Sequence, residues 1–269
     1  MRVLRLGMLQ FGAVRGKEEN LAKIKSLIKS SEADLILLPE YSMGNIVGAS
    51  PKDLLTIAEP IDGPFVEGLA SVAREYSTYL IAGIFEKVGN GVYNTAVVVS
   101  PSGDLVGRYR KVHLFDAYSY RESDYFLAGN EPSPIINVGK AKVAVAICFD
   151  IRFPELFRIY ALSGAELVAV PSAWFRGPLK EETLAFLARA RAHENTIYLA
   201  LSVQYSKDFT GRSMVVDPLG VVVADLGIGE KYAEVPIDLD YIDEARKILP
   251  VLKLRREDVY KKAGLRWTS

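Results

Sequence analysis

The sequence predicts a layered α/β fold with mixed sheets, built from two similar halves. Short apolar runs alternate with amphipathic segments along the whole chain, and no low-complexity linker divides it. Turn sequences at 101–104 and 217–220 each lie between two strand-like segments, which is typical of hairpins. The segment Ala-Asp-Leu-Ile-Leu-Leu-Pro at 33–39 is similar to Ala-Glu-Leu-Val-Ala-Val-Pro at 165–171, and each follows a predicted helix. The 269 residues are enough to bury a large core between such layers.

The first half is expected to alternate strands and helices before it turns into a hairpin. After a strand at 4–11 we expect a helix at 17–30, because Leu21, Ile24 and Ile28 recur on one helical face. Residues 35–38 are continuously apolar, as expected for a strand that is covered on both sides. A helix at 65–76 follows Pro64, which suits a first helical turn, and strands are then predicted at 79–85, 92–100 and 105–110.

The second half is expected to repeat this alternation. A predicted strand at 142–147 runs directly into Cys148. A helix at 154–163, a strand at 167–170, a helix at 180–195 and a strand at 197–203 follow, and the hairpin around 217–220 comes last. Parallel strands, helices and hairpins together indicate mixed sheets.

Composition argues against several classes of protein. Lys plus Arg and Asp plus Glu both number 33, so the formal net charge is zero, whereas proteins that bind nucleic acids or membrane surfaces carry a basic excess. The chain has no apolar run of about 18 residues and begins without a signal-peptide pattern, so we expect a cytoplasmic protein that does not cross a membrane. One Cys and two His cannot form an internal disulfide or a Cys/His zinc site, and we expect no metal. A low number of Gln residues beside abundant Glu, Lys and Arg is a composition that favours a thermophilic source.

Cys148 stands where a buried strand meets a turn into a helix. Such a junction places a side chain at the carboxyl end of a sheet, where α/β proteins have their sites. Helix N-termini and backbone N–H groups there favour a thiolate and can hold an oxyanion. The alternative is an inert core cysteine. A Cys–His pair would need His113 or His193, but His113 is better explained as a structural hydrogen-bonding residue and His193 as a solvated or interface residue on a polar helix.

Glu40 and Lys111 are the other candidates for chemistry. Glu40 ends a buried strand, so we expect its carboxylate at the same sheet end as Cys148, with a raised pKa that suits a general base. Lys111 closes a strand in a basic cluster with Arg108 and Arg110. Taken singly, the glutamate is better explained as a capping or salt-bridged residue and the lysine as a surface cation.

Three separated motifs together resemble those of the nitrilase superfamily of carbon–nitrogen hydrolases. They are Leu-Leu-Pro-Glu at 37–40, Tyr-Arg-Lys-Val-His-Leu-Phe at 109–115 and Ile-Cys-Phe-Asp-Ile-Arg-Phe-Pro-Glu at 147–155. Through this resemblance Glu40, Lys111 and Cys148 match the Glu–Lys–Cys triad of the family. Glu122 falls where many members have a second active-site glutamate.

The resemblance implies a four-layer αββα sandwich that forms a homodimer or a higher homo-oligomer. It places a carbon–nitrogen hydrolase domain at 1–239 and a C-terminal helix and tail at 240–269, at the dimer interface. It implies a small-molecule amide substrate and no cofactor. Glu40 would act as the base, the thiol of Cys148 would form a thioester, Lys111 and the backbone N–H of Phe149 would hold the oxyanion, and Glu122 would position Lys111 or the substrate.

The resemblance also indicates a substrate class. The segment after Cys148 looks most like the branch of omega-amidases and deaminated-glutathione amidases, which implies a carboxylate-bearing linear amide that is cleaved to an acid and ammonia. Arg152 matches a position at which related carbamoylases bind a substrate carboxylate, a role that suits a planar guanidinium. A structural bridge from Arg152 to Glu155 or Asp150 is the alternative.

One segment departs from that branch. Where many members have Gly-x-x-His-Trp, this chain has Gly-Pro-Leu-Lys-Glu at 177–181. Tyr41, Trp174 and Phe175 are therefore expected to line the pocket. A hydrolase of N-carbamoyl amino acids or carbamoyl amines with the same triad is an alternative, and so is a non-catalytic binding protein of this fold.

Overall fold

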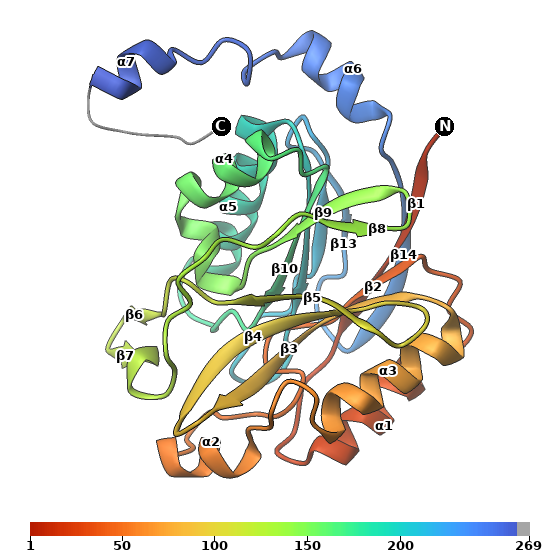
Figure 1. Ribbon diagram of the computed structural model, residues 1–269, viewed down its shortest axis with the longest axis vertical. Helices are drawn as coiled ribbons and strands as arrows, with labels where there is room; N and C mark the ends of the chain where they lie inside the picture. The colour runs from red at the N-terminus through yellow and green to blue at the C-terminus, as the bar shows by residue number, and fades with distance from the viewer. Residues whose placement is uncertain (263–269) are drawn as a thin grey trace.

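The protein forms four layers, as predicted. The structure is a computed structural model that describes residues 1–262. Two six-stranded sheets pack face to face, and helices cover the outer face of each (Figure 1). The fold confirms the αββα sandwich.

The first sheet has the strand order β14-β1-β2-β3-β4-β5. The central strands β1, β2 and β3 are parallel, whereas β14 pairs antiparallel with β1 and the hairpin strands β4 and β5 complete the other edge. The bounds are β1 Val3–Gln10, β2 Leu35–Leu37, β3 Tyr79–Val88, β4 Gly91–Val99, β5 Leu105–Arg110 and β14 Lys231–Asp238.

The second sheet has the order β13-β12-β11-β10-β9-β8 and the same plan. Its central strands β9, β10 and β11 are parallel, and antiparallel strands flank them on both sides. The bounds are β8 Ile136–Val138, β9 Ala141–Val145, β10 Leu167–Ser172, β11 Tyr198–Val203, β12 Met214–Val216 and β13 Val222–Asp225.

Helices cover the outer faces. Helices α1 and α3 lie on the first sheet, and α4 and α5 lie on the second (Figure 1). The bounds are α1 Lys17–Leu27, α2 Pro51–Ile57, α3 Pro64–Tyr76, α4 Pro154–Leu162, α5 Lys180–Asn195, α6 Tyr241–Ile248 and α7 Glu257–Lys262. Short elements near the cavity described below are the hairpin of β6 Asp116–Ala117 and β7 Tyr120–Arg121, and the 3₁₀ turns η1 Glu122–Asp124 and η2 Cys148–Arg152.

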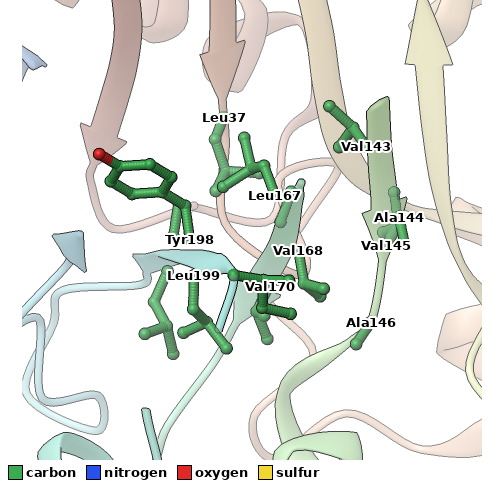
Figure 2. Packing of buried hydrophobic residues seen from close by; sticks show 14 of the residues in the cluster. Leu37, Val143, Ala144, Val145, Ala146, Leu167, Val168, Val170, Tyr198 and Leu199 are labelled. Atoms are coloured by element: carbon green, nitrogen blue, oxygen red, sulfur yellow. The ribbon is translucent and has the colours of Figure 1, made fainter. Parts of the chain in front are cut away.

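Strand β2 shows why a continuous apolar run suits this fold. Leu35 and Leu37 belong to the core between the two sheets, whereas Ile36 and Leu38 belong to the cluster beneath α1 and α3. Figure 2 shows Leu37 with Leu167 in the inter-sheet core. Because successive side chains of a strand point to opposite faces, a central strand that is covered on both faces needs apolar residues at every position.

The element boundaries differ from the predictions in a few places. The first helix ends at Leu27 and not at residue 30, since Ser30 adopts a left-handed backbone with φ +61° that ends the helical path. Helix α2 was not predicted, although Ser50 caps it through a reciprocal capping box with Asp53 and Pro51 opens it. Helix α5 spans 180–195 as predicted.

The segment predicted as a C-terminal helix and tail, 240–269, includes α6 and α7, which run along one edge of the sandwich (Figure 1). Its last seven residues, 263–269, lie outside the described residues. Its role at a dimer interface stays a prediction. Within 1–262, no helix is both long enough and apolar enough to cross a membrane.

Candidate active site

A cavity opens where strand ends of the two sheets meet. Glu40 follows β2 of the first sheet, and Cys148 follows β9 of the second, so the two residues lie at adjoining ends of different sheets and not at one end of a single sheet as expected. The cavity is lined by Glu40, Tyr41, Lys111, Phe115, Tyr120, Glu122, Cys148, Phe149, Arg152, Ala173, Trp174, Phe175 and Lys180. Every side chain that the sequence placed at the site therefore lies at this cavity.

Glu40 is buried and held from three directions. Its Oε1 accepts hydrogen bonds from Lys111 Nζ at 2.9 Å and from Asn94 Nδ2 at 2.7 Å, and its Oε2 accepts the backbone N–H of Ala173 at 2.7 Å. Burial raises the pKa of Glu40 above the ordinary carboxyl value, although the ammonium of Lys111 opposes the rise. The carboxylate is fixed in place and has the raised pKa that was predicted for a base.

Lys111 is not the surface cation that its sequence neighbours suggest. Its ammonium is buried and lies 2.9 Å from Glu40 Oε1 and 2.8 Å from Glu122 Oε2. Burial alone would lower its pKa, but the carboxylates of Glu122 and Glu40 outweigh that effect and raise the pKa of Lys111 well above its usual value. Arg110, the preceding residue, points elsewhere and pairs with the buried Glu86.

Glu122 is the second carboxylate on this ammonium. It is fully buried at the start of η1, and it accepts hydrogen bonds from Asn94 Nδ2 at 2.9 Å and from the hydroxyl of Tyr41 at 3.2 Å. The backbone N–H of Phe115 donates to it at 2.6 Å. Glu122 therefore joins Lys111 to the wall of the cavity.

Cys148 occupies a strained turn. It is the first residue of η2, with φ +43°, a left-handed conformation that a residue with a side chain adopts at a cost of about 1–3 kcal/mol. Its thiol is buried beside Glu40, and burial together with that negative charge raises the pKa of Cys148 well above its ordinary value. Desolvation therefore outweighs the helix N-terminus and the neighbouring N–H groups, which favour a thiolate.

Asp150 ties the turn that carries Cys148 to the segment around Lys111, which directly follows β5. Its Oδ2 accepts the hydroxyl of Tyr109 at 2.8 Å and the backbone N–H of Ile147 at 2.9 Å. Its Oδ1 accepts the backbone N–H of His113 at 3.1 Å and lies 2.8 Å from His113 Nδ1. One buried carboxylate thus binds Tyr109 and His113, which lie on either side of Lys111. The same carboxylate binds Ile147, the residue before Cys148.

The two histidines have the roles that their sequence contexts favoured. His113 is bound to Asp150 and stacks on Phe153 with ring centroids 3.7 Å apart, as a structural hydrogen-bonding residue. His193 is exposed on α5, with Nδ1 3.0 Å from the carbonyl oxygen of Leu219. Neither imidazole lines the cavity, whereas the carboxylate of Glu40 lies beside Cys148.

A glycine allows the close approach of the chain around Glu40. A Cβ at Gly83 of β3 would lie 2.7 Å from Glu40 Cα and 2.9 Å from the backbone nitrogen of Tyr41. Gly83 also donates its N–H to the carbonyl of Pro39 at 3.2 Å. Since the atoms in the way belong to the backbone, only glycine fits at this position without moving Glu40.

The mouth of the cavity, formed by Arg152, Trp174 and Lys180, is aromatic and cationic. The guanidinium carbon of Arg152 lies 4.9 Å from the ring centroid of Trp174, and Arg152 Nε is buried without a hydrogen-bond partner among the described residues. Within residues 1–262, the alternative bridge from Arg152 to Glu155 or Asp150 is not formed. Lys180 also lines the mouth.

Some site residues were missed in the sequence. Asn94 bridges Glu40 and Glu122, and its signal was available, because an amide inside the apolar strand β4 must find polar partners when buried. Gln204 donates to the carbonyl of Glu40 at 2.9 Å. Ala173 acts through its backbone and Lys180 through its place at the mouth, and neither residue carries a local signal.

The arrangement suits acyl transfer to sulfur. A thiol lies next to a carboxylate with a raised pKa, and a buried ammonium stands ready to stabilise developing negative charge. Among the described residues, no group of three or more His, Cys, Asp or Glu side chains is arranged to bind a metal ion.

Comparisons with known proteins agree over nearly the whole chain. The model of the carbon–nitrogen hydrolase family matches residues 5–247. Omega-amidase NIT2 of Xenopus tropicalis is 35% identical over 97% of this chain and 98% of its own length. The deaminated glutathione amidase of Rattus norvegicus is 33% identical over 95% of this chain and 83% of its own. The crystal structure of a carbon–nitrogen hydrolase from Helicobacter pylori G27 has a TM-score of 0.90 at 25% identity and covers 99% of this chain and 100% of that one.

Proposed function

Because this chain belongs to the carbon–nitrogen hydrolase family, the nitrilase superfamily, we propose that it hydrolyses a small linear amide that carries a carboxylate, through a thioester on Cys148. The observation that carries the proposal is the buried contact of Lys111 with Glu40 and Glu122 in the same cavity as the thiol. A structural ion pair would not need a strained, cavity-lining cysteine beside it.

Acylation begins from a neutral thiol. Glu40 accepts the proton of Cys148 as the sulfur attacks the amide carbon, so that no isolated buried thiolate has to form. The negative charge that develops on the amide oxygen is held by Lys111 and by the backbone N–H of Phe149, which lies in the first turn of η2 and has no intrahelical acceptor. Glu40 then returns the proton to the leaving nitrogen, the carbon–nitrogen bond breaks, and ammonia departs.

Deacylation uses the same groups. Glu40, again a carboxylate, takes a proton from water as the water oxygen attacks the thioester carbon. The carbon–sulfur bond breaks, and the proton passes from Glu40 to the sulfur, which restores the thiol and releases the acid. Glu122 keeps Lys111 in position through both steps.

The cavity supports a small substrate. Its free volume is about 30 Å³, whereas a single buried water needs about 10–15 Å³. The carboxamide group of a small substrate would lie beside Cys148, and the rest of the substrate would extend to the mouth. There we propose that Tyr41, Trp174 and Phe175 contact it and that Arg152, which pairs with no carboxylate of residues 1–262, binds its carboxylate. The names of the two relatives, an omega-amidase and a deaminated glutathione amidase, agree with an amide of this kind.

The proposal is tested by trapping the thioester. The protein is mixed briefly with a panel of linear amides and N-carbamoyl amino acids, quenched in acid and examined by intact-mass and peptide mass spectrometry, with ammonia and carbon dioxide measured in parallel. We expect an acyl adduct on Cys148 that disappears in Cys148→Ala, together with ammonia release. Absence of both adduct and turnover, with Cys148 unreactive toward iodoacetamide in the folded protein, would exclude the activity. Carbon dioxide released together with ammonia would identify a carbamoyl hydrolase.

A further inference from the structure

The ionisable groups around the cavity divide into a paired floor and an unpaired mouth. At the floor, Lys111 contacts two carboxylates. At the mouth, Arg152 and Lys180 are half-buried and form no ion pair with a carboxylate of the described residues. The mouth therefore carries two positive charges with which no carboxylate in the described part of the chain forms an ion pair.

Lys180 is held at the mouth by its own backbone. It opens α5, and its carbonyl oxygen accepts the indole N–H of Trp174 at 2.8 Å. Its ammonium lies over the ring of Tyr118, 3.5 Å from the centroid, and 6.0 Å from the centroid of Trp174. The neighbouring Arg176 is different, because it lies 3.8 Å from Glu181 and does not line the cavity.

Both mouth cations border the same indole ring. The charge centres of Arg152 and Lys180 lie 4.9 Å and 6.0 Å from the centroid of Trp174. Two like charges beside an aromatic wall repel each other more strongly than they would in water, and an anion between them removes that repulsion. Contact with the face of a tyrosine is a weaker interaction for an ammonium than a charge-assisted hydrogen bond to a carboxylate.

We propose that Lys180 is a specificity-determining residue that, together with Arg152, binds the carboxylate at the far end of the amide substrate. The inference rests on the proposed function and deepens it, since it assigns a second cation to the substrate carboxylate. Arg152 offers a planar, fixed pair of donors, and Lys180 adds a mobile point charge that leaves Tyr118 to reach the anion. With the carboxylate at the mouth, the carboxamide points to Cys148 at the floor.

The test compares two amides of the same shape. Succinamate is the monoamide of a four-carbon dicarboxylic acid, and 4-methylpentanamide has two methyl groups in place of its carboxylate oxygens. Ammonia release from each is measured for the wild-type protein, for Lys180→Met, for the charge-preserving Lys180→Arg and for Arg176→Met as the matched control. Thermal unfolding of each variant verifies that it is folded.

Loss of one charged hydrogen-bond donor predicts a rise in KM for succinamate of about tenfold in Lys180→Met, with kcat nearly unchanged. The kinetics with 4-methylpentanamide should stay as in the wild type, Lys180→Arg should restore most of the affinity for succinamate, and Arg176→Met should change neither amide. Added salt should raise the KM for succinamate in the wild type more than in Lys180→Met.

Three results would overturn the inference. The first is an unchanged KM for succinamate in Lys180→Met, and the second is an equal loss with both amides, which would indicate a general disturbance of the cavity. The third is equal kcat/KM for the two amides in the wild type, which would leave the amidase activity standing and remove the cationic selection. If instead neither amide is hydrolysed and Cys148 is not acylated by any amide of the panel, the proposed function itself fails, and the inference with it.

Discussion

The ends of β2 and β10 are alike in sequence and place but not in chemistry. Each strand lies at the centre of its sheet between two parallel neighbours, and each reaches a proline, Pro39 or Pro171. After the proline, the first half has Glu40 and the second has Ser172. The first strand end thus brings a carboxylate to the cavity, and the second brings the backbone N–H of Ala173, which donates to that carboxylate at 2.7 Å.

This comparison shows how a repeated scaffold supports an asymmetric site. Buried parallel strands need the same apolar residues in both halves, so the halves look alike where they are packed. The residues just after the strands are free of that constraint and differ. Cys148 lies on neither of the two similar strands but after β9, in a turn with its own backbone strain.

The largest expected effect comes from Glu40→Gln, which removes the base at the end of β2. An amide fills the same space but cannot take a proton, so we expect kcat/KM for ammonia release to fall by about 10²–10⁴-fold. Ser172→Ala, at the matching position after Pro171, should leave the rate near that of the wild type, because the hydroxyl of Ser172 donates to the carbonyl of Val170 and Ser172 does not line the cavity. An equal loss of kcat/KM in the two variants would contradict the proposal that the two strand ends differ in function.

Lys111→Met should lower the rate of Cys148 acylation by about 10²–10³-fold, since it removes an oxyanion donor.

The same substitution also leaves Glu40 and Glu122 buried without their ammonium, at a cost of about 3–5 kcal/mol in the free energy of unfolding at neutral pH. Lys111 lowers the pKa of Glu40, so its loss raises that pKa further, and the variant should regain stability as the pH falls and a carboxylate takes up a proton. Urea unfolding at neutral and mildly acidic pH measures this, and wild-type acylation rates would contradict the assignment of Lys111.

Asp150→Asn tests the support of the Cys148 side. The amide cannot accept all four contacts, so the turn shifts relative to Lys111, and we expect kcat to fall by about 10²-fold. Glu59→Gln is the control, because Glu59 is also a buried carboxylate but binds Lys17 and the backbone N–H of Phe65. It should lower the melting temperature and leave kcat unchanged. A parallel loss of kcat in both variants would mean that Asp150 contributes stability alone.

Gly83→Ala tests the support of the Glu40 side in the same way. The added methyl group would meet the backbone of Glu40 and Tyr41 and displace the base, so we expect kcat to fall by about tenfold. Gly16→Ala is the matched control, because the nearest atom to its added Cβ is 3.6 Å away. Steady-state kinetics of both variants decide the point, and an unaffected Gly83→Ala would show that Glu40 tolerates movement.

The smallest effect is a shift in pH dependence. Glu40 works as a base only when ionised, so kcat/KM should be lost as the pH falls through its raised pKa, above the value of about 4.3 for an ordinary glutamate. The charge of Glu122 contributes to that rise in the pKa of Glu40, and Glu122→Gln should therefore move the acid limb to lower pH even though it also lowers the rate. A limb that moves to higher pH would contradict the assignment.

The layers and the three motifs could be predicted from local features of the sequence. Apolar runs, helical spacing and turn residues are local features, and they located β2, β10, α5 and both hairpins to within a few residues. The motifs around Glu40, Lys111 and Cys148 were also readable, because each lies within a few consecutive residues.

How those motifs meet depends on the packing of the two sheets, which no local pattern predicts. Lys111 is 71 residues from Glu40 along the chain, and Ala173 is 133 residues from it, yet both donate hydrogen bonds to the carboxylate of Glu40. The neutral thiol of Cys148, the hydrogen bonds of Asp150 and the place of Lys180 at the mouth follow from that convergence. Burial and neighbouring charges set the pKa values of the site residues and the preference of the mouth for an anion. Both depend on which strand ends come together when the two sheets pack.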